Sequence, residues 1–222
     1  MSNSSPHPEP YLITFLFDKH NNWIEPHIRQ SGKFFDNPKY TFKTSHNPDE
    51  VFNQDIVFIV GYTKILKPEF LAKNQLNLVI HESDLPLGKG FSPVQWQILE
   101  GKNEIAVCLI EASDPVDSGN IFLKSSFTLN GFELYDEIRS KQAVATIDVI
   151  AEFLQIYPVF NASKQTGADS FYRRRSSKDG ELDIQKSISD QFGLLRIGNN
   201  EEWPSYFYVD GQKYVLKIFK SE

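Results

Sequence analysis

Apolar residues gather in short runs along the first 130 residues, and polar stretches separate these runs. Residues 11–17, 55–61 and 76–80 are almost continuously apolar, which is typical of parallel strands buried on both faces. Ser92 and Pro93 give a strong helix start, and Gly101 a good stop. The pattern predicts an α/β fold with a mostly parallel twisted sheet and helices on both faces. Strands are expected over residues 11–17, 40–44, 55–61, 76–80, 105–111, 121–127, 205–209 and 212–219, and helices over 23–29, 68–73, 92–101, 133–158 and 183–197.

After residue 160 the sequence changes character. Residues 161–180 are polar and loop-like, the helix that follows is expected to be interrupted near Gly193, and Asp210-Gly211 is a strong signal for a two-residue hairpin. About sixty residues ending in one hairpin are too few for an independent core. We therefore expect a sheet domain over residues 1–160 and a C-terminal appendage with a β-hairpin over residues 161–222.

Composition narrows the class of protein. The chain has 222 residues and a formal net charge of −6, which argues against a surface that reads nucleic-acid phosphates. A single cysteine, Cys108, excludes an internal disulfide and a thiolate metal cluster. Residues 1–10 suggest a disordered arm without the features of a signal peptide, and the early apolar run is too short to span a bilayer. We expect a soluble cytoplasmic protein.

Two common cofactor signals are missing. His7, His20, His27 and His46 are scattered without the spacing of metal ligands, so no metal site is expected. No Gly-x-Gly-x-x-Gly motif follows Phe17, so a nicotinamide cofactor is not expected either.

Three motifs between residues 81 and 121 carry most of the functional signal. They are His-Glu-Ser-Asp-Leu-Pro at 81–86, Lys-Gly-Phe-Ser-Pro-Val-Gln-Trp at 89–96, and Asp-Ser-Gly-Asn-Ile at 117–121. Their order and spacing resemble the 10-formyltetrahydrofolate-dependent formyltransferases, whose signature runs His-Pro-Ser-Leu-Leu-Pro, Arg-Gly-x-x-Pro-x-x-Trp and Asp-x-Gly-x-Ile. The resemblance covers residues 55–157 well and the tail loosely. It implies a formyltransferase-like fold with a shortened N-terminal half, a catalytic domain over residues 1–160, and 10-formyltetrahydrofolate as cofactor.

Formyl transfer to an amine requires a donor near the developing oxyanion and a group that moves protons. By resemblance, His81 is the donor, and Asp117 orients it and helps to remove the amine proton. The strand over 76–80 would place His81 at the carboxyl edge of the sheet, where open α/β sheets carry their sites. The alternative for His81 is a strand-end histidine bonded to backbone.

The sequence departs from the family at one catalytic position. The family has an asparagine two residues before the histidine, and here that position is Val79, which cannot donate a side-chain hydrogen bond. Asn77 shares a strand face with Val79 and His81 but is too far back along the strand to replace the asparagine. Ser83 or a backbone N–H is expected to supply the missing donor.

The resemblance also places the ligands. The pterin would lie in a pocket walled by Tyr62, Ile65 and Leu66 on one side and by Asp114 and Val116 on the other; for Ile65 and Leu66 a simple core role is the alternative. Lys89 and Gly90 replace the family's Arg-Gly, and this glycine would let backbone approach the ligand. Trp96 is expected in the core.

The one basic cluster follows later in the chain, at Tyr172, Arg173, Arg174 and Arg175. Arginine forks suit a diphosphate, and a tyrosine could stack on a base or ribose. The alternative is a solvated charge run that Asp179, Glu181 and Asp183 neutralise.

The residues within these motifs are most similar to those of the nucleotide-sugar N-formyltransferase branch, in particular of the enzymes of pseudaminic acid synthesis. We therefore expect an enzyme that formylates the amine of a nucleotide-linked amino-dideoxy sugar for surface polysaccharide or nonulosonic acid. Its partner would be a small-molecule nucleotide sugar, with no nucleic acid and no membrane; a homodimer stays open. The alternatives are a methionyl-tRNA formyltransferase-like enzyme, against which the acidic charge argues, and a degenerate folate-fold binding module.

Overall fold

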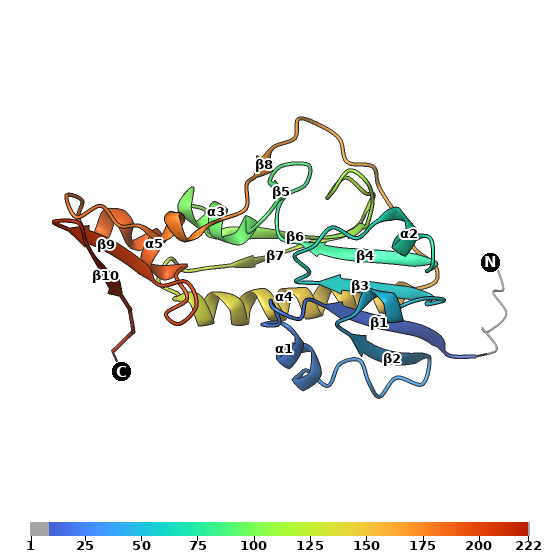
Figure 1. Ribbon diagram of the computed structural model, residues 1–222. Helices are drawn as coiled ribbons and strands as arrows, with labels where there is room; N and C mark the ends of the chain where they lie inside the picture. Colours follow the sequence, from blue (N-terminus) through green and yellow to red (C-terminus); the bar gives the residue numbers. More distant parts are fainter. Residues whose placement is uncertain (1–8, 222) are drawn as a thin grey trace.

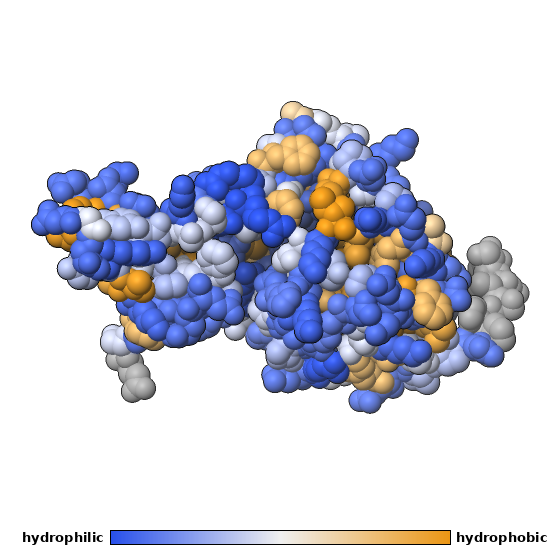
Figure 2. Space-filling model, viewed as in Figure 1, coloured by the Kyte–Doolittle hydropathy of each residue, from blue (hydrophilic) through white to orange (hydrophobic). Residues whose placement is uncertain are grey.

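The structure is a computed structural model that describes residues 9–221. Most of the arm expected over residues 1–10 therefore lies outside the described residues. Figure 1 shows an elongated molecule, with a broad sheet body and a hairpin at one end. Figure 2 shows that the face visible in this view is mostly hydrophilic, with several separate apolar areas, one of them near its middle.

Six strands form one sheet in the order β2-β1-β3-β4-β6-β7. β1 pairs in parallel with β2 and β3, and β3 with β4, whereas the β4–β6 and β6–β7 pairs are antiparallel. The predicted mostly parallel sheet is confirmed, and the antiparallel part is its second half. The strands are β1 (Tyr11–Phe17), β2 (Tyr40–Ser45), β3 (Ile56–Val60), β4 (Leu76–His81), β6 (Glu104–Glu111) and β7 (Ile121–Thr128).

Helices cover both faces of this sheet (Figure 1). The long helix α4 (Tyr135–Ile156) packs with α1 (Glu25–Gln30) on one face, over a core that includes Phe15, Phe58 and Phe153. The other face packs against α2 (Pro68–Leu71) through Phe70. α3 (Pro93–Leu99) joins a smaller cluster with Ile105 of β6 and Ile138 of α4. Since α4 ends two residues before Pro158, the proline stop is confirmed.

Alternate residues of β4 point to opposite faces. Leu78 and Ile80 belong to the core beneath α4, whereas Val79 packs with the clusters on the opposite face. His81 ends the strand on the same face as Val79, because side chains in a strand repeat every second residue. The face shared by Asn77, Val79 and His81 is thus the one on which α2 lies.

The chain after α4 returns across the sheet toward the hairpin end (Figure 1). On the way, β8 (Phe171–Tyr172) pairs in parallel with β5 (Lys89–Gly90), a contact that the sequence pattern did not predict. The hairpin expected around Asp210-Gly211 is present as β9 (Ser205–Val209) and β10 (Gln212–Leu216). Short 3₁₀ turns also occur at Pro48–Glu50, Ser177–Gly180 and Ser189–Gln191.

One predicted helix is wrong in extent. Residues 183–188 are not helical, and the helical part is limited to the turn at Ser189–Gln191 and to α5 (Phe192–Arg196). Gly193 lies inside α5 and does not interrupt it. The segment still packs firmly, because Arg196 forms a 3.0 Å ion pair with Glu133 in which both side chains are buried. The domain boundary near residue 160 stays a prediction.

Candidate functional site

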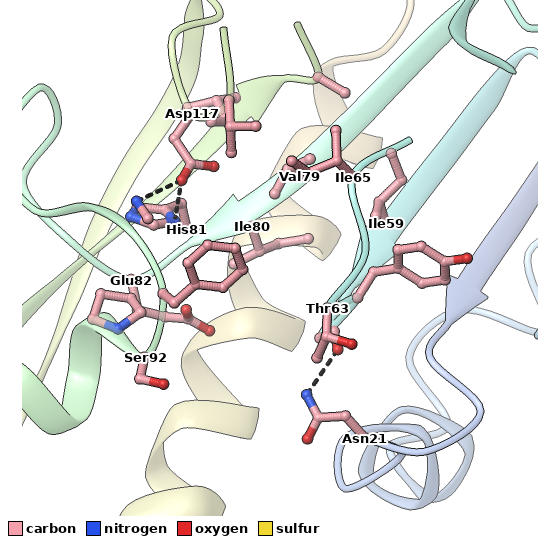
Figure 3. A pocket seen from close by; sticks show the side chains of 18 of the residues that line it. Asn21, Ile59, Thr63, Ile65, Val79, Ile80, His81, Glu82, Ser92 and Asp117 are labelled. Atoms are coloured by element: carbon pink, nitrogen blue, oxygen red, sulfur yellow. Dashed lines mark hydrogen bonds and ion pairs between the residues drawn. The ribbon is translucent and has the colours of Figure 1, made fainter. Parts of the chain in front are cut away.

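A cavity opens at the carboxyl ends of β3 and β4 (Figure 3). Its walls come from the β3–α2 loop, the end of β4, residues 90–95 and the loop that follows β6. α4 contributes Arg139 and Gln142, and the returning C-terminal segment contributes Arg174. Open α/β sheets place ligands at this edge, so the cavity is the candidate functional site.

His81 and Asp117 meet in this cavity. Nδ1 of His81 lies 3.5 Å from Oδ2 of Asp117, and the two residues are 5% and 9% exposed. In Figure 3 the carboxylate points down toward the imidazole from the loop after β6. The contact that the motif order predicts is therefore present, although 36 residues separate the two positions.

The second ring nitrogen of His81 also has a partner. Nε2 lies 2.8 Å from the carbonyl oxygen of Gly88. A carbonyl can only accept, so Nε2 carries a proton, and Nδ1 then faces a carboxylate. The two contacts thus fix the orientation of the ring.

Strand β5 holds Asp117 from the other side. The backbone N–H of Gly90 donates to Oδ2 of Asp117 at 2.9 Å. Gly90 has a φ of 98°, and a Cβ there would lie 2.4 Å from the carbonyl oxygen of Tyr172. The glycine is thus required by the β5–β8 pairing, whereas the sequence interpretation assigned it to ligand approach.

Lys89 turns away from the cavity. Its Nζ lies 3.2 Å from Oγ of Ser118 and 3.3 Å from Oδ2 of Asp169, and the side chain is buried. Lys89 therefore anchors the C-terminal segment beside the site, and a direct substrate contact is not what the structure shows.

Ser83 does not face the cavity, contrary to the expectation that it supplies a donor. Its hydroxyl donates to the carbonyl of Leu87 at 2.8 Å, and the residue is 2% exposed. Its own carbonyl accepts from the buried thiol of Cys108, whose pKa is raised by burial. Ser83 thus shapes the loop that presents Gly88 to His81.

Val79 stands where the family has its asparagine, and it lines the cavity. Its strand partners are Ile59 on β3 and Ile110 on β6, and both of them line the cavity as well. Asn77 is not a substitute, because its amide donates to the carbonyl of Leu71 in α2 at 2.9 Å. The wall beside His81 is therefore aliphatic across three strands.

Four of the five residues expected around the pterin line the cavity: Tyr62, Ile65, Leu66 and Val116. Ile65 is 69% exposed, so it is not a core residue, whereas Leu66 packs against the cluster around Phe70. Burial, helped by the carboxylates of Asp18 and Asp49, raises the pKa of Tyr62, which keeps its hydroxyl protonated. Asp114 is exposed and does not line the cavity.

The basic cluster does not act as one unit. Arg174 alone lines the cavity: it lies over the ring of Phe91 at 4.0 Å and donates to the carbonyl of Thr63 at 2.7 Å. Arg173 instead pairs with Asp179, and this hydrogen bond holds the pKa of Asp179 well below its usual range. Arg175 donates to the backbone carbonyl of Asp179 at 2.9 Å.

Tyr172 also points elsewhere. Its hydroxyl donates to Glu100 at 2.8 Å, and its ring stacks on Trp96 with centroids 6.3 Å apart. Of the four residues expected to bind the substrate, Arg174 lines the cavity and the other three do not. The alternative of a neutralised charge run describes Arg173.

Sequence reasoning missed a polar chain on the wall that α4 forms. Glu82 accepts from Gln142 at 2.6 Å, and Gln142 accepts from Arg139 at 2.8 Å. The guanidinium of Arg139 lies 4.4 Å from the ring centre of Trp23, which is another cavity residue. Arg139 and Gln142 are three residues apart, the spacing of neighbours on one helix face. That spacing was the signal in the sequence that could have revealed this polar chain.

The comparisons with known proteins show the family of this chain. Residues 33–152, more than half of the chain, match the model of the Formyl transferase family. The chain belongs to this family. Among curated proteins it is similar to a methionyl-tRNA formyltransferase from Rickettsia africae, with 28% identity over 196 residues, which cover 83% of this chain and 62% of that protein. The chain thus spans less than two thirds of the length of such relatives.

Solved structures show the same fold at low identity. A methionyl-tRNA formyltransferase from Clostridium thermocellum matches with a TM-score of 0.81 at 21% identity, covering 96% of this chain and 94% of that chain. A 4-N formyltransferase from Francisella tularensis gives 0.76 at 13% identity, covering 96% and 98%. HypX from Aquifex aeolicus, solved in complex with tetrahydrofolic acid, gives 0.75 at 14% identity, covering 94% of this chain and 37% of that chain.

Proposed function

We propose that this protein transfers a formyl group from 10-formyltetrahydrofolate to the amino group of a nucleotide-linked amino-dideoxy sugar. The product would serve surface polysaccharide or nonulosonic acid synthesis. The observation that carries the proposal is the buried His81–Asp117 pair, with atoms 3.5 Å apart, in a cavity at the carboxyl edge of a formyl transferase fold. A cytoplasmic location follows from this role as a prediction.

The cavity fits a folate. Ile65, Leu66 and Val116 give it apolar walls against which a flat ring can lie, and Ile65 is 69% exposed and therefore accessible to a ligand. The neighbouring loops add backbone polar groups near these side chains. When bound, 10-formyltetrahydrofolate supplies a formyl carbon that an amine can attack.

The residues of the chain divide the chemistry between them. Both ring nitrogens of His81 are engaged in this structure, Nε2 by Gly88 and Nδ1 by Asp117. To stabilise negative charge on the formyl oxygen, His81 would redirect its Nε2–H from the carbonyl of Gly88 to that oxygen. Oδ2 of Asp117 is used by His81 and Gly90. No hydrogen bond among the described residues engages Oδ1, which leaves this oxygen to take the proton of the attacking amine.

Arg174 and the chain's charge favour a nucleotide sugar as the amine substrate. Arg174 is the member of the basic cluster that reaches the cavity, and a guanidinium suits a phosphate oxygen. The net charge of −6 is unfavourable for binding tRNA phosphates. Similarity to methionyl-tRNA formyltransferases supports tRNA as the second candidate substrate.

A formylation assay decides between these substrates. Radiolabelled 10-formyltetrahydrofolate would be offered with a panel of nucleotide-linked amino sugars and, separately, with charged initiator tRNA. Label in a sugar supports the proposal, and label in the tRNA alone contradicts it. Folate binding with no transfer to any amine would support the binding module instead.

The role of His81 needs its own test. His81→Ala should reduce kcat by a factor on the order of 10² to 10⁴, the usual contribution of a positioned acid–base group. The Kd for tetrahydrofolate should change little, because the cavity walls that suit a pterin come from other loops. His27→Ala, a matched change on α1, should leave kcat unaltered. Full activity of His81→Ala would mean that the chemistry lies elsewhere.

A further inference from the structure

Glu82 stands directly after His81, at the position where the family signature has a proline. A proline side chain is apolar, whereas Glu82 brings a carboxylate to the wall of the cavity. In Figure 3 Glu82 lies on the same side of the cavity as His81, away from Ile59. A charged acceptor therefore stands near the place where the amine substrate has to meet the formyl group.

Two helices hold Glu82 in position. Its backbone carbonyl accepts from the side-chain amide of Gln97 in α3 at 2.7 Å, and its Oε1 accepts from the amide of Gln142 in α4 at 2.6 Å. Gln142 is buried, and its own side-chain oxygen accepts from Arg139 at 2.8 Å. The carboxylate is thus oriented before any ligand arrives, so it loses little conformational entropy when it binds one.

The second carboxylate oxygen of Glu82 is left for a ligand. Within residues 9–221 no hydrogen bond engages Oε2 and no cation forms an ion pair with the side chain, since Arg139 reaches it only through Gln142. An ionised carboxylate accepts hydrogen bonds and cannot donate them. Hydrogen bonds to a charged acceptor are also stronger than neutral ones. Oε2 therefore suits a ligand that presents hydroxyl donors.

We propose that Glu82 determines the substrate specificity of the site by accepting a hydrogen bond from the sugar hydroxyl next to the reacting amine. The inference rests on the proposed function, since it takes the amine substrate to be a sugar. The carbon atoms of a methionyl group carry no hydroxyl, so the second candidate substrate offers Oε2 no such donor beside its amine. A site built around a hydroxyl discriminates against compounds that lack it, because its own polar group is then left unpaired.

Glu82→Gln removes this contact with little change of shape. The amide oxygen can still accept from Gln142, but an NH₂ group takes the place of Oε2 and cannot accept. We expect the KM for the sugar nucleotide to rise on the order of tenfold. The value of kcat should change little, because His81 and Asp117 stay in place. The Kd for tetrahydrofolate should not change.

Steady-state kinetics on the full chain, with two enzymes and two substrates, test the contact directly. The probes are the nucleotide-linked amino sugar that accepts label in the formylation assay and its analogue without the hydroxyl next to the amine. For the wild type, the analogue should have a KM on the order of tenfold higher. For Glu82→Gln, the two compounds should have nearly the same KM. This loss of discrimination measures the coupling between the carboxylate and the hydroxyl, which a purely structural role of Glu82 would not change.

Glu50→Gln is the matched control. The carboxylate of Glu50 also accepts from a side-chain amide, that of Asn47 at 3.1 Å, but it does not line the cavity. This variant has the same change of charge and should keep both KM values. Gln142→Leu tests the positioning of Glu82: it should reduce the discrimination between the two sugars and leave the Kd for tetrahydrofolate unaltered.

Two results would overturn the inference and leave the proposed function intact. One is a wild type that has the same KM for both sugars. The other is a Glu82→Gln variant whose KM rises by the same factor for both, because the carboxylate would then act on the charge of the amine and not on the hydroxyl. If label enters only the tRNA, the proposed function fails and the inference fails with it.

Discussion

Gly90 donates its backbone N–H to Oδ2 of Asp117 at 2.9 Å, and the same oxygen faces His81. A two-residue strand thus supplies a backbone hydrogen bond to the carboxylate that we propose to be catalytic. That strand is held in turn by β8, through the pairing of Gly90 with Tyr172.

Gly90→Ala should therefore disturb the site without removing any catalytic group. A Cβ there would lie 2.4 Å from the carbonyl oxygen of Tyr172, so β5 and β8 must separate. The hydrogen bond to Asp117 should weaken with this movement. We expect a clear fall in kcat and a lower melting temperature, measured by steady-state kinetics and circular dichroism.

Gly101→Ala is the matched control. Gly101 also has a positive φ, 81°, but no atom lies within 4 Å of its Cβ position. Both variants carry the backbone strain of about 1–2 kcal/mol, and only Gly90→Ala adds the collision. If both variants lose the same stability and activity, β5 does not position Asp117.

Val79→Asn tests whether the site has been rebuilt around an aliphatic wall. The new amide would stand between Ile59 and Ile110, which offer it no hydrogen-bond partner. We expect a loss of roughly 1–3 kcal/mol in the free energy of unfolding and a slower enzyme. Val79→Ala serves as the control for lost packing. A variant with asparagine that is faster and equally stable would show that an oxyanion donor is simply missing.

The arginines of the basic cluster should separate in kinetics. Arg174→Ala should raise the KM for the amine substrate on the order of tenfold, because its guanidinium lies in the cavity. Arg173→Ala should change this KM much less, since that side chain is 63% exposed and pairs with Asp179. Equal effects of the two changes would indicate a shared structural role.

The buried carboxylate of Glu133 should make stability depend on acid pH. Burial raises the pKa of Glu133, but hydrogen bonds from Lys141 and the N–H of Asn130 outweigh it and bring the pKa from 4.5 to about 2. Because the folded-state pKa is the lower one, this stabilisation is present above about pH 4.5 and is lost as the pH falls toward 2. Its size is about 3 kcal/mol at neutral pH.

Urea unfolding at pH 7 and pH 3 measures the stabilisation that the ionised Glu133 contributes. Glu133→Gln should be less stable at pH 7 and should lose less on acidification than the wild type. Glu201→Gln, whose side chain is 77% exposed beside Lys217, should follow the wild type at both values. A Glu133→Gln curve parallel to the wild type would rule out the linkage.

Local pattern was sufficient to predict much of the fold. The continuous apolar run at residues 11–17 and the proline at 158 mark a strand and a helix end that the structure confirms. Residues 183–188 show the limit, because they have helix-compatible composition but lie in an exposed loop held by polar contacts such as that between Gln191 and Asp183. The two-residue strands β5 and β8 carry no periodicity, and only their pairing defines them.

The candidate site, like the fold, could be predicted only in part from the sequence. The resemblance in motif order was sufficient to predict that His81 and Asp117 meet. The direction of the strands would not have shown it, because β6 is antiparallel to β4 and its last residue, Glu111, lies beside Leu78.

Motif order could not show which way Ser83 points, because its partner Leu87 is not implied by the motif. It also could not decide whether Arg173 turns to the substrate or to Asp179. Gln142 and Arg139 were missed because the long helix that contains them was predicted from its apolar residues alone.

The β5–β8 pairing has a consequence for synthesis of the protein on the ribosome. The six sheet strands and α4 end at residue 156, whereas the partner of Gly90 is residue 172. Domains fold as the chain emerges from the N-terminus, so the sheet can form while the carboxylate of Asp117 still lacks its final support. The nascent chain would thus form its sheet before the carboxylate of Asp117 is held in place, and that support arrives only with residues 171–172.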